Sequence, residues 1–230
     1  MMLRGRLGQG TFTGSRGADG DLRLVSDDAG AFIKFADLYS RMEGGNLDLT
    51  LHTGGDASAG SATVTNFALR GEPALQKLVA AAPSRAPGAA VDPNLARFQK
   101  MKIDFARSPG ELEIKDAVIY NPNMGLTTAG VIDFTHSAID VSGTFVPAYS
   151  VNNLLNNIPL VGVLLGGQNE GVFAISYHVQ GPLSGPQLTI NPLSAIAPGI
   201  LRKFLGAVDG TSARGGAAPS ETAATPQYQR

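Results

Sequence analysis

The chain has 230 residues, of which 43% are hydrophobic and 16% charged, and its formal net charge at pH 7 is -1. Few charges combined with 29 Gly and 14 Pro are typical of a β-rich globular protein rather than of a disordered one. The chain lacks the surplus of Lys and Arg that binds nucleic-acid phosphates, and without Cys it cannot form disulfides, thiolate nucleophiles or Cys-based zinc sites.

The first part of the chain predicts strands and two helices. Alternating apolar and polar residues indicate strands at residues 7–13, 21–25, 47–51 and 62–70. Apolar residues at three- and four-residue spacing predict a front helix over residues 28–42, which Gly44-Gly45 would end. We expect four residues of this helix to pack on the sheet: Phe32, Phe35, Tyr39 and Met42. A second, short helix is expected over residues 73–82.

The rest of the chain continues with strands joined by connections of hairpin length. Strands are expected at residues 101–105, 112–120, 127–134, 138–145, 172–179 and 187–191. The short turns between them predict an antiparallel meander. Helical turns broken at Pro159 are expected over residues 151–165, and an apolar helical stripe over residues 196–208. Residues 209–230 consist largely of Gly, Ala, Ser, Thr and Pro and are expected to be disordered.

The expected fold class is mainly β: a curved, open, groove-like antiparallel sheet with the front amphipathic helix and a short C-terminal helix packed on it. We expect one domain over residues 1–208, followed by the disordered tail. The N-terminus lacks the apolar run of a secretory signal, and no window reaches the ~20 apolar residues of a membrane helix. A strand close to Met1 would lie at a sheet edge, where free backbone groups recruit another strand.

Two segments, which together cover about half the chain, resemble the C-terminal region of the AsmA-like family, a group that includes YhdP-type and TamB-type proteins. The first segment runs from Asp28-Ala29-Gly30-Ala31-Phe32 to Gly44-Gly45-Asn46-Leu47-Asp48-Leu49. The second includes Gly143-Thr144-Phe145-Val146-Pro147, Ile158-Pro159-Leu160-Val161-Gly162 and Tyr177-His178-Val179-Gln180-Gly181-Pro182. The second segment is the more specific of the two.

The resemblance implies a function in phospholipid transport between the inner and outer membranes, or in outer-membrane maintenance. It also implies a location in the periplasm, with attachment to the inner membrane through an N-terminal anchor that this chain lacks. We therefore expect the chain to be the end of a longer protein. The partners implied are phospholipid acyl chains, the upstream β-strands of a parent chain or other envelope proteins, and the membrane surface; nucleic acid is not among them.

The candidate lipid-lining residues are apolar positions of the predicted strands. They are Leu112, Ile114, Val118, Ile132, Phe134, Val141 and Phe145. The same positions fit a plain core beneath the front helix equally well. The helix at residues 196–208 would either lie at a membrane interface or cap the end of the groove. Its apolar stripe includes Ile196, Ile200, Leu201, Phe204 and Leu205.

The sequence offers no catalytic or metal-binding pattern. His52, His136 and His178 lie in separate strands or turns without metal-ligand spacing, and no Gly-x-Ser-x-Gly elbow or phosphate-binding loop occurs. We therefore expect neither an enzyme nor a cofactor. The alternative functions are a structural or interaction module of an envelope protein that does not bind lipid and, third, a closed fatty-acid carrier.

Overall fold

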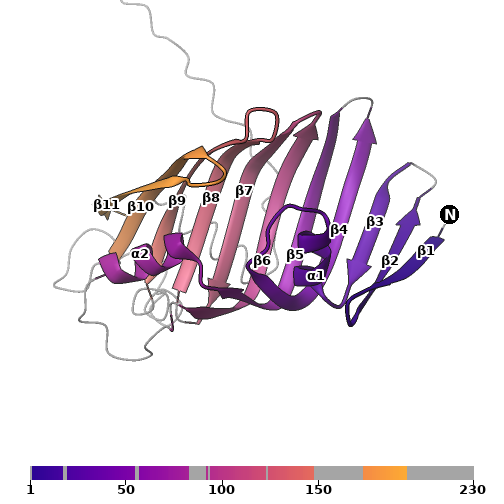
Figure 1. The fold of residues 1–230 in the computed structure, drawn as a ribbon, viewed down its shortest axis with the longest axis horizontal. Coiled ribbons are helices and arrows are strands. Elements are labelled where there is room, and N and C mark those ends of the chain that lie inside the picture. The colour runs from indigo at the N-terminus through magenta and orange to yellow at the C-terminus, as the bar shows by residue number, and fades with distance from the viewer. Residues whose placement is uncertain are drawn as a thin grey trace, which may run out of the picture.

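The computed structural model describes residues 2–17, 20–54, 57–82, 92, 94–122, 124–147 and 173–195. Within these residues the chain forms eleven strands and two short helices. The strands build one open antiparallel sheet, in which each strand pairs with its neighbours in the chain, from β1 to β11 (Figure 1). This confirms the predicted mainly β fold with an open sheet.

The elements have the following bounds. The strands are β1 (Met2–Leu7), β2 (Gly10–Arg16), β3 (Leu22–Ser26), β4 (Met42–Gly54), β5 (Ala57–Arg70), β6 (Leu95–Ser108), β7 (Glu111–Asn121), β8 (Met124–Asp133), β9 (Ala138–Pro147), β10 (Phe173–Pro182) and β11 (Gln187–Ala195). The helices are α1 (Ala29–Phe35) and α2 (Pro73–Ala81). Both helices cover the same face of the sheet, which we call the inner face; the opposite face is the outer face (Figure 1).

Short turns produce the meander. The β6–β7 and β8–β9 turns lie at the end of the sheet that we call the upper end, where Gly110 has a φ of +79° that favours glycine. The two turns are joined, because the backbone N–H of Phe134 donates to the carbonyl of Gly110 at 2.8 Å. The two hairpins are therefore joined to each other at the upper rim of the sheet.

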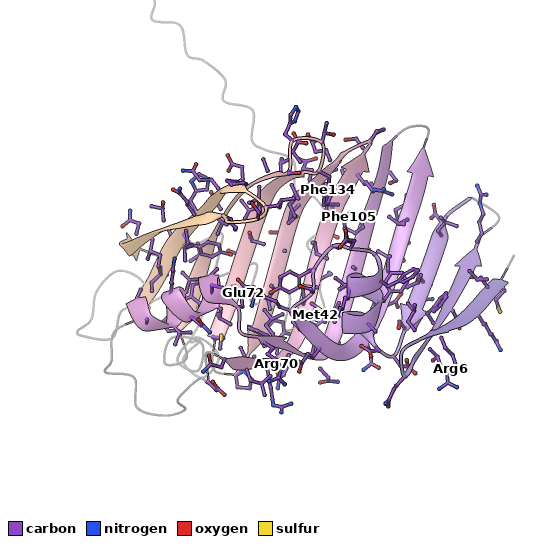
Figure 2. The ribbon with its side chains drawn as sticks, viewed as in Figure 1. Arg6, Met42, Arg70, Glu72, Phe105 and Phe134 are labelled. Carbon is purple, nitrogen blue, oxygen red and sulfur yellow. The ribbon has the colours of Figure 1, made fainter. Side chains whose placement is uncertain are left out.

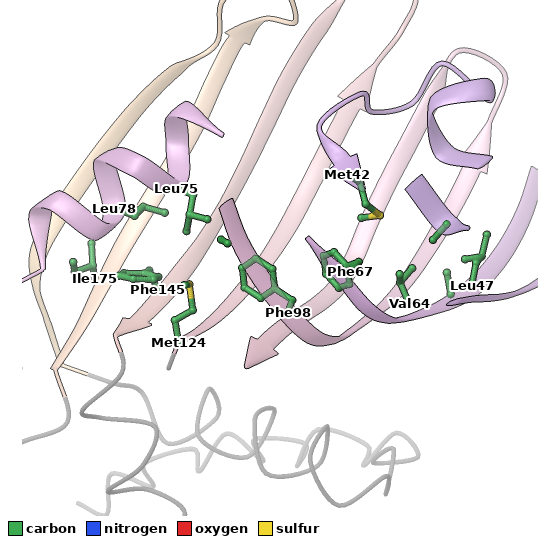
Figure 3. Close-up of a cluster of buried hydrophobic side chains, with 13 residues drawn as sticks. Met42, Leu47, Val64, Phe67, Leu75, Leu78, Phe98, Met124, Phe145 and Ile175 are labelled. Atoms are coloured by element: carbon green, nitrogen blue, oxygen red, sulfur yellow. The ribbon is translucent and has the colours of Figure 1, made fainter. Parts of the chain in front are cut away.

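The hydrophobic core lies in the lower half of the inner face. It combines residues of both helices with residues of six strands, and Figure 3 shows its largest side chains. Its members are Ala29, Met42, Leu47, Ala62, Val64, Phe67, Leu75, Leu78, Ala96, Phe98, Met124, Phe145 and Ile175. Leu75 and Leu78 of α2 are 3% and 2% exposed, so this helix closes the core on the β9–β10 side.

The lower ends of β4, β5 and β6 are bent at the same level. The β5–β6 register passes from Thr65↔Lys100 to Phe67↔Phe98, which leaves Asn66 and Gln99 outside the regular pairing. Asn66 adopts a left-handed φ of +57° at this break in the pairing. Below this break Phe67 and Phe98 stack with ring centroids 5.4 Å apart, and both rings belong to the core.

The start of α2 is tied to the connection that follows α1. Glu72 caps α2 by accepting from the backbone N–H of Ala74 at 3.2 Å, and it also accepts from the hydroxyl of Tyr39 at 2.5 Å. Burial and the hydrogen bond to the Glu72 carboxylate both raise the pKa of Tyr39. The guanidinium of Arg41 donates to the carbonyl of Gly71 at 2.5 Å, which completes the link.

The predicted front helix is too long. Helix α1 ends at Phe35, and Gly44-Gly45 lies inside β4 instead of ending a helix. Asp37 ends α1 with a left-handed φ of +54°: its N–H bonds to Lys34 and the next N–H bonds to Ile33, the pattern usually built with glycine. Phe35 is 73% exposed, so the expectation that it packs on the sheet is wrong. Met42 is buried, but as part of β4.

The predicted strand bounds also need correction at the N-terminal end. The strand expected at residues 7–13 crosses a turn at Gly8, whose φ is +61°, and residues 14–16, which lie between two predicted strands, belong to β2. The later predicted strands at residues 62–70, 127–134 and 138–145 fall on β5, β8 and β9. The expected helices at 151–165 and 196–208, and the tail at 209–230, lie outside the described residues.

Candidate functional site

Strand register arranges the inner face into rows that cross the sheet. The upper row is Leu22, Leu51, Gly60, Phe105, Ile114, Gly130, Val141, Val179 and Leu188. The middle row is Leu24, Leu49, Ala62, Ile103, Ala117, Thr128, Gly143, Tyr177 and Ile190. The lower row is Ser26, Leu47, Val64, Met101, Ile119, Leu126, Phe145 and Ile175. Directly paired residues share a face, so each row is a continuous track.

The three rows differ in exposure. The lower row contributes Leu47, Val64, Phe145 and Ile175 to the buried core. In contrast, many aliphatic and aromatic side chains of the upper and middle rows are only half-buried. They include Leu49, Leu51, Ile103, Phe105 and Ile114. Above them, Leu112 and Ile132 are paired on the same face and are also half-buried. The upper part of the inner face is thus an open apolar surface.

Aromatic rings lie over glycines of this surface. A Cβ at Gly60 would lie 2.7 Å from Cζ of Phe105, and a Cβ at Gly143 would lie 2.6 Å from Cζ of Tyr177. The Tyr177 hydroxyl donates to the carbonyl of Thr127 at 2.9 Å, and burial raises the pKa of Tyr177 to about 12. Each ring therefore covers the backbone of a glycine, which has no side chain of its own to cover it. Aromatic residues often pair with glycines across neighbouring strands in this way.

Charge is divided sharply between the two faces. Among the register-paired strand residues that the structure describes, the inner face holds two charged residues, Arg16 and Arg107, and no Asp or Glu. The outer face carries ion pairs, such as Arg23 with Asp48 at 2.7 Å. An apolar ligand would therefore meet few polar groups on the inner face and many on the outer face.

All three histidines have an Asp partner, and none lies on the inner face. His52 contacts Asp21 at 2.6 Å, and His178 contacts Asp140 at 2.8 Å. At the upper rim, the Asp133 carboxylate lies 2.6 Å from Nδ1 of His136, and the hydrogen bond between them raises the pKa of His136 and lowers that of Asp133. Within the described ranges, no group of three or more metal-ligating side chains forms a candidate metal site.

The outer face contains two open hollows. One, of about 520 Å³, is lined by small polar side chains of β8–β11, including Thr127, Ser142 and His178. The other, of about 610 Å³, lies beside the bend and is lined by Glu43, Arg70 and other residues. Arg70 is held by Glu43 through two hydrogen bonds. The first hollow is lined by small polar side chains and the Arg70–Glu43 pair of the second is already formed, so we regard the inner face as the stronger candidate site.

The structure brings five of the seven predicted lining residues onto the inner face. These are Leu112, Ile114, Ile132, Val141 and Phe145. Val141 and Phe145 are 7% and 2% exposed, and Phe145 belongs to the core cluster beneath α2, whereas the other three are half-buried. Phe145 therefore lies in a core beneath a helix, as the alternative expectation stated, but that helix is α2 and not the front helix.

Two of the predicted lining residues lie elsewhere. A bulge between Ile114 and Ala117 reverses the alternation along β7, so Val118 points to the outer face, where it is 5% exposed. Phe134 lies in the β8–β9 turn at the upper rim and is 39% exposed (Figure 2). The residues predicted for the C-terminal helix, Ile196, Ile200, Leu201, Phe204 and Leu205, lie outside the described residues.

Sequence reasoning missed about half of the open apolar surface. Leu49, Leu51, Ile103 and Phe105 line it from β4 and β6, and Val179 lines it from β10. The signal was present, because each of these strands has the same alternation as β8 and β9. The missing information was the register, which alone shows that the alternating strands present one common face.

Among the described residues, no helix combines the length and apolar character needed to cross a lipid bilayer. Comparison with known proteins identified no relative: no protein-family model, no curated protein and no solved structure matches the chain.

Proposed function

We propose that the chain holds lipid acyl chains on the open apolar part of its inner face, as one step of phospholipid transport or outer-membrane maintenance in a bacterial envelope. The observation that supports this proposal is the pair of half-buried rows that cross β3–β11 without an acidic residue. Large contiguous apolar surface is uncommon on soluble proteins unless it binds something.

The chemistry of the surface suits a hydrocarbon chain. An acyl chain needs no hydrogen bonds, and removing each CH₂ from water contributes ~0.8 kcal/mol, offset in part by the entropy of ordering the chain. With neighbouring strands about 4.8 Å apart, the rows extend for roughly 40 Å from β3 to β11. Such a surface binds by area, so no single side chain should be indispensable.

The biological setting of the proposal comes from the resemblance to AsmA-like proteins. The resemblance implies a location in the periplasm, where the chain would extend a lipid track from the inner membrane toward the outer membrane. In this role the chain binds and conducts a ligand and performs no chemistry on it. Its partners would be phospholipids, the membrane surface and neighbouring strands of the envelope machinery.

Site-specific photo-crosslinking tests the proposal. A photoreactive residue at Ile114 or Ile132 would lie on the open inner face, whereas one at Glu113 or Val131 would lie on the outer face of the same two strands. Val131 is the matched control, because it is also apolar and half-buried. We expect the inner-face positions to capture phospholipid in cells. Equal labelling on both faces, or none on the inner face, would contradict the proposal.

One observation favours a second candidate function, that of an interaction module that does not bind lipid. Strand β1 lies at an edge of the described sheet, and its Met2 and Leu3 are 64% and 58% exposed. An edge strand with exposed apolar residues can add a strand from another protein. In that case crosslinkers at Leu3 would capture protein, while those at Ile114 and Ile132 would capture no lipid.

A further inference from the structure

The inner face has an asymmetry that the acyl-chain proposal does not use: its two charges are both positive and both lie toward the upper end. Arg107 is near the end of β6 and pairs with Ser58 on one side and Leu112 on the other. Arg16 pairs with Leu22 at the upper end of β2. The two arginines are separated by four strand spacings, about 19 Å, so they cannot hold the same small group.

Arg107 has the more apolar surroundings of the two. The half-buried side chains of Phe105, Leu112 and Ile114 lie immediately below and beside it on the same face. Arg107 itself is exposed, and no described acidic side chain forms an ion pair with it. The carboxylates of the nearby strand positions, Glu111 and Glu113 of β7, belong to the outer face.

We infer that Arg107 selects amphiphiles with an anionic head group, phosphate or carboxylate, and fixes their orientation on the sheet. This inference rests on the proposed acyl-chain site. The head group would lie at the upper rim beside the guanidinium, and the alkyl chain would pass over Phe105 and Ile114 toward Ile103. From Arg107 to Ile103 the strand rises by about 13 Å, and beyond that level the helices cover the lower row.

The physical reason is complementarity at a boundary between water and an apolar surface. A guanidinium donates hydrogen bonds in a planar fork that matches phosphate and carboxylate oxygens, and a long Arg side chain can lie along apolar surface while its charge stays in water. No described strand residue of the inner face is acidic, so an anion bound there would be attracted by Arg107 and would not be repelled by a neighbouring carboxylate. A neutral head group such as a hydroxyl can accept a hydrogen bond from Arg107 but gains no attraction between opposite charges.

Binding of three ligands with the same twelve-carbon chain tests the inference in the full-length protein. Laurate and dodecyl phosphate below their micelle concentrations, and 1-dodecanol below its solubility limit, would compete with the neutral dye Nile red. We expect the two anions to bind about three- to fivefold more tightly than the alcohol, the effect usual for a solvent-exposed ion pair. The preference should fall as salt is added, because the charges are exposed. A preference for only one anion would identify the head group as phosphate or carboxylate.

Three variants separate the head-group inference from the acyl-chain proposal. Arg107→Gln should abolish the preference for anions and leave dodecanol binding unchanged. Lys100→Gln, which removes a positive charge from the outer face of the same strand, should leave the preference intact. Ile114→Asn should weaken all three ligands. An equal affinity of the wild type for the three ligands, or a preference that survives in Arg107→Gln, would overturn the head-group inference alone; no binding of any ligand would overturn both.

Discussion

Single residues of this sheet have roles that depend on the face to which they point. Tyr177 and Phe105 lie over glycines of the inner face, while His178, next to Tyr177, contacts Asp140 on the outer face. The alternation that produces this division is visible in the sequence and correctly places Leu112, Ile114 and Ile132. The alternation misplaces Val118, because the bulge after Ile114 adds one residue to β7 and so turns Val118 to the other face. Nothing in the local sequence indicates this bulge.

The Asp133–His136 pair at the upper rim gives a pH dependence that can be measured at one residue. Its hydrogen bond raises the pKa of His136 above the ordinary value of 6.5 and lowers the pKa of Asp133 below 3.8. The His136 contribution to stability is full below its unfolded-state pKa and is lost as pH rises through the raised folded-state value. The Asp133 contribution is present above its unfolded-state pKa and is lost as pH falls through the lowered value.

The pair should therefore be strongest between about pH 4 and pH 6.5. We expect NMR titration to give His136 a midpoint above 6.5, and Asp133→Asn to lower that midpoint. Asp140→Asn is the matched control, since Asp140 contacts His178 and not His136. An unchanged midpoint in Asp133→Asn would mean that the two side chains do not interact in solution. Both groups are exposed, so the effect on global stability should be small.

Among the elements, the two helices show what sequence patterns can and cannot determine. Helix α2 was predicted almost to the residue, because Pro73 at its first position and a short apolar stripe agree with its structure. Helix α1 was predicted to end seven residues too late, since Tyr39 and Met42 continue its apolar spacing. Only the backbone shows that Asp37 takes the left-handed position usually held by glycine.

Removing one side chain from each helix should give opposite results. Leu78→Ala should lower the free energy of unfolding by about 2–5 kcal/mol, because the side chain is 2% exposed in the core cluster with Phe145 and Ile175. Phe35→Ala should change the free energy of unfolding by less than about 0.5 kcal/mol, because that ring is 73% exposed. Urea denaturation followed by circular dichroism measures both. A large loss for Phe35→Ala would mean that α1 extends onto the sheet, as the sequence predicted.

At the scale of the whole molecule, strand order was easier to predict than the common apolar face. Short turns between alternating strands leave the meander as the simplest topology, and the structure has that order throughout. The face depends on register across nine strands, in which one slipped residue would turn a whole strand over. The bulge after Ile114 alters that register, and no local propensity reveals it.

A sheet in which each strand pairs only with its chain neighbours resembles a linear array, so its stability should vary from one end to the other. Strands β1–β3 are 5–7 residues long, whereas β4–β6 have 13–14 residues. At the far end, α2 adds Leu75 and Leu78 to the core with Phe145 of β9 and Ile175 of β10, although its own chain position is between β5 and β6. Helix α2 therefore stabilises the C-terminal end of the sheet from a distant position in the chain, whereas α1 is the only described helix near β1–β3.

Amide hydrogen exchange should reveal this gradient. We expect the slowest exchange in β5 and β6 and the fastest in β1, whose outer edge has no described partner strand. Leu78→Ala should speed exchange in β9 and β10 while leaving β2 and β3 unchanged, because α2 packs on the former pair. Phe35→Ala provides the control with an exposed side chain. If β1–β3 exchanged as slowly as β5, or if Leu78→Ala accelerated every strand equally, the sheet would unfold as one cooperative unit, and α2 would stabilise the whole sheet instead of its C-terminal end.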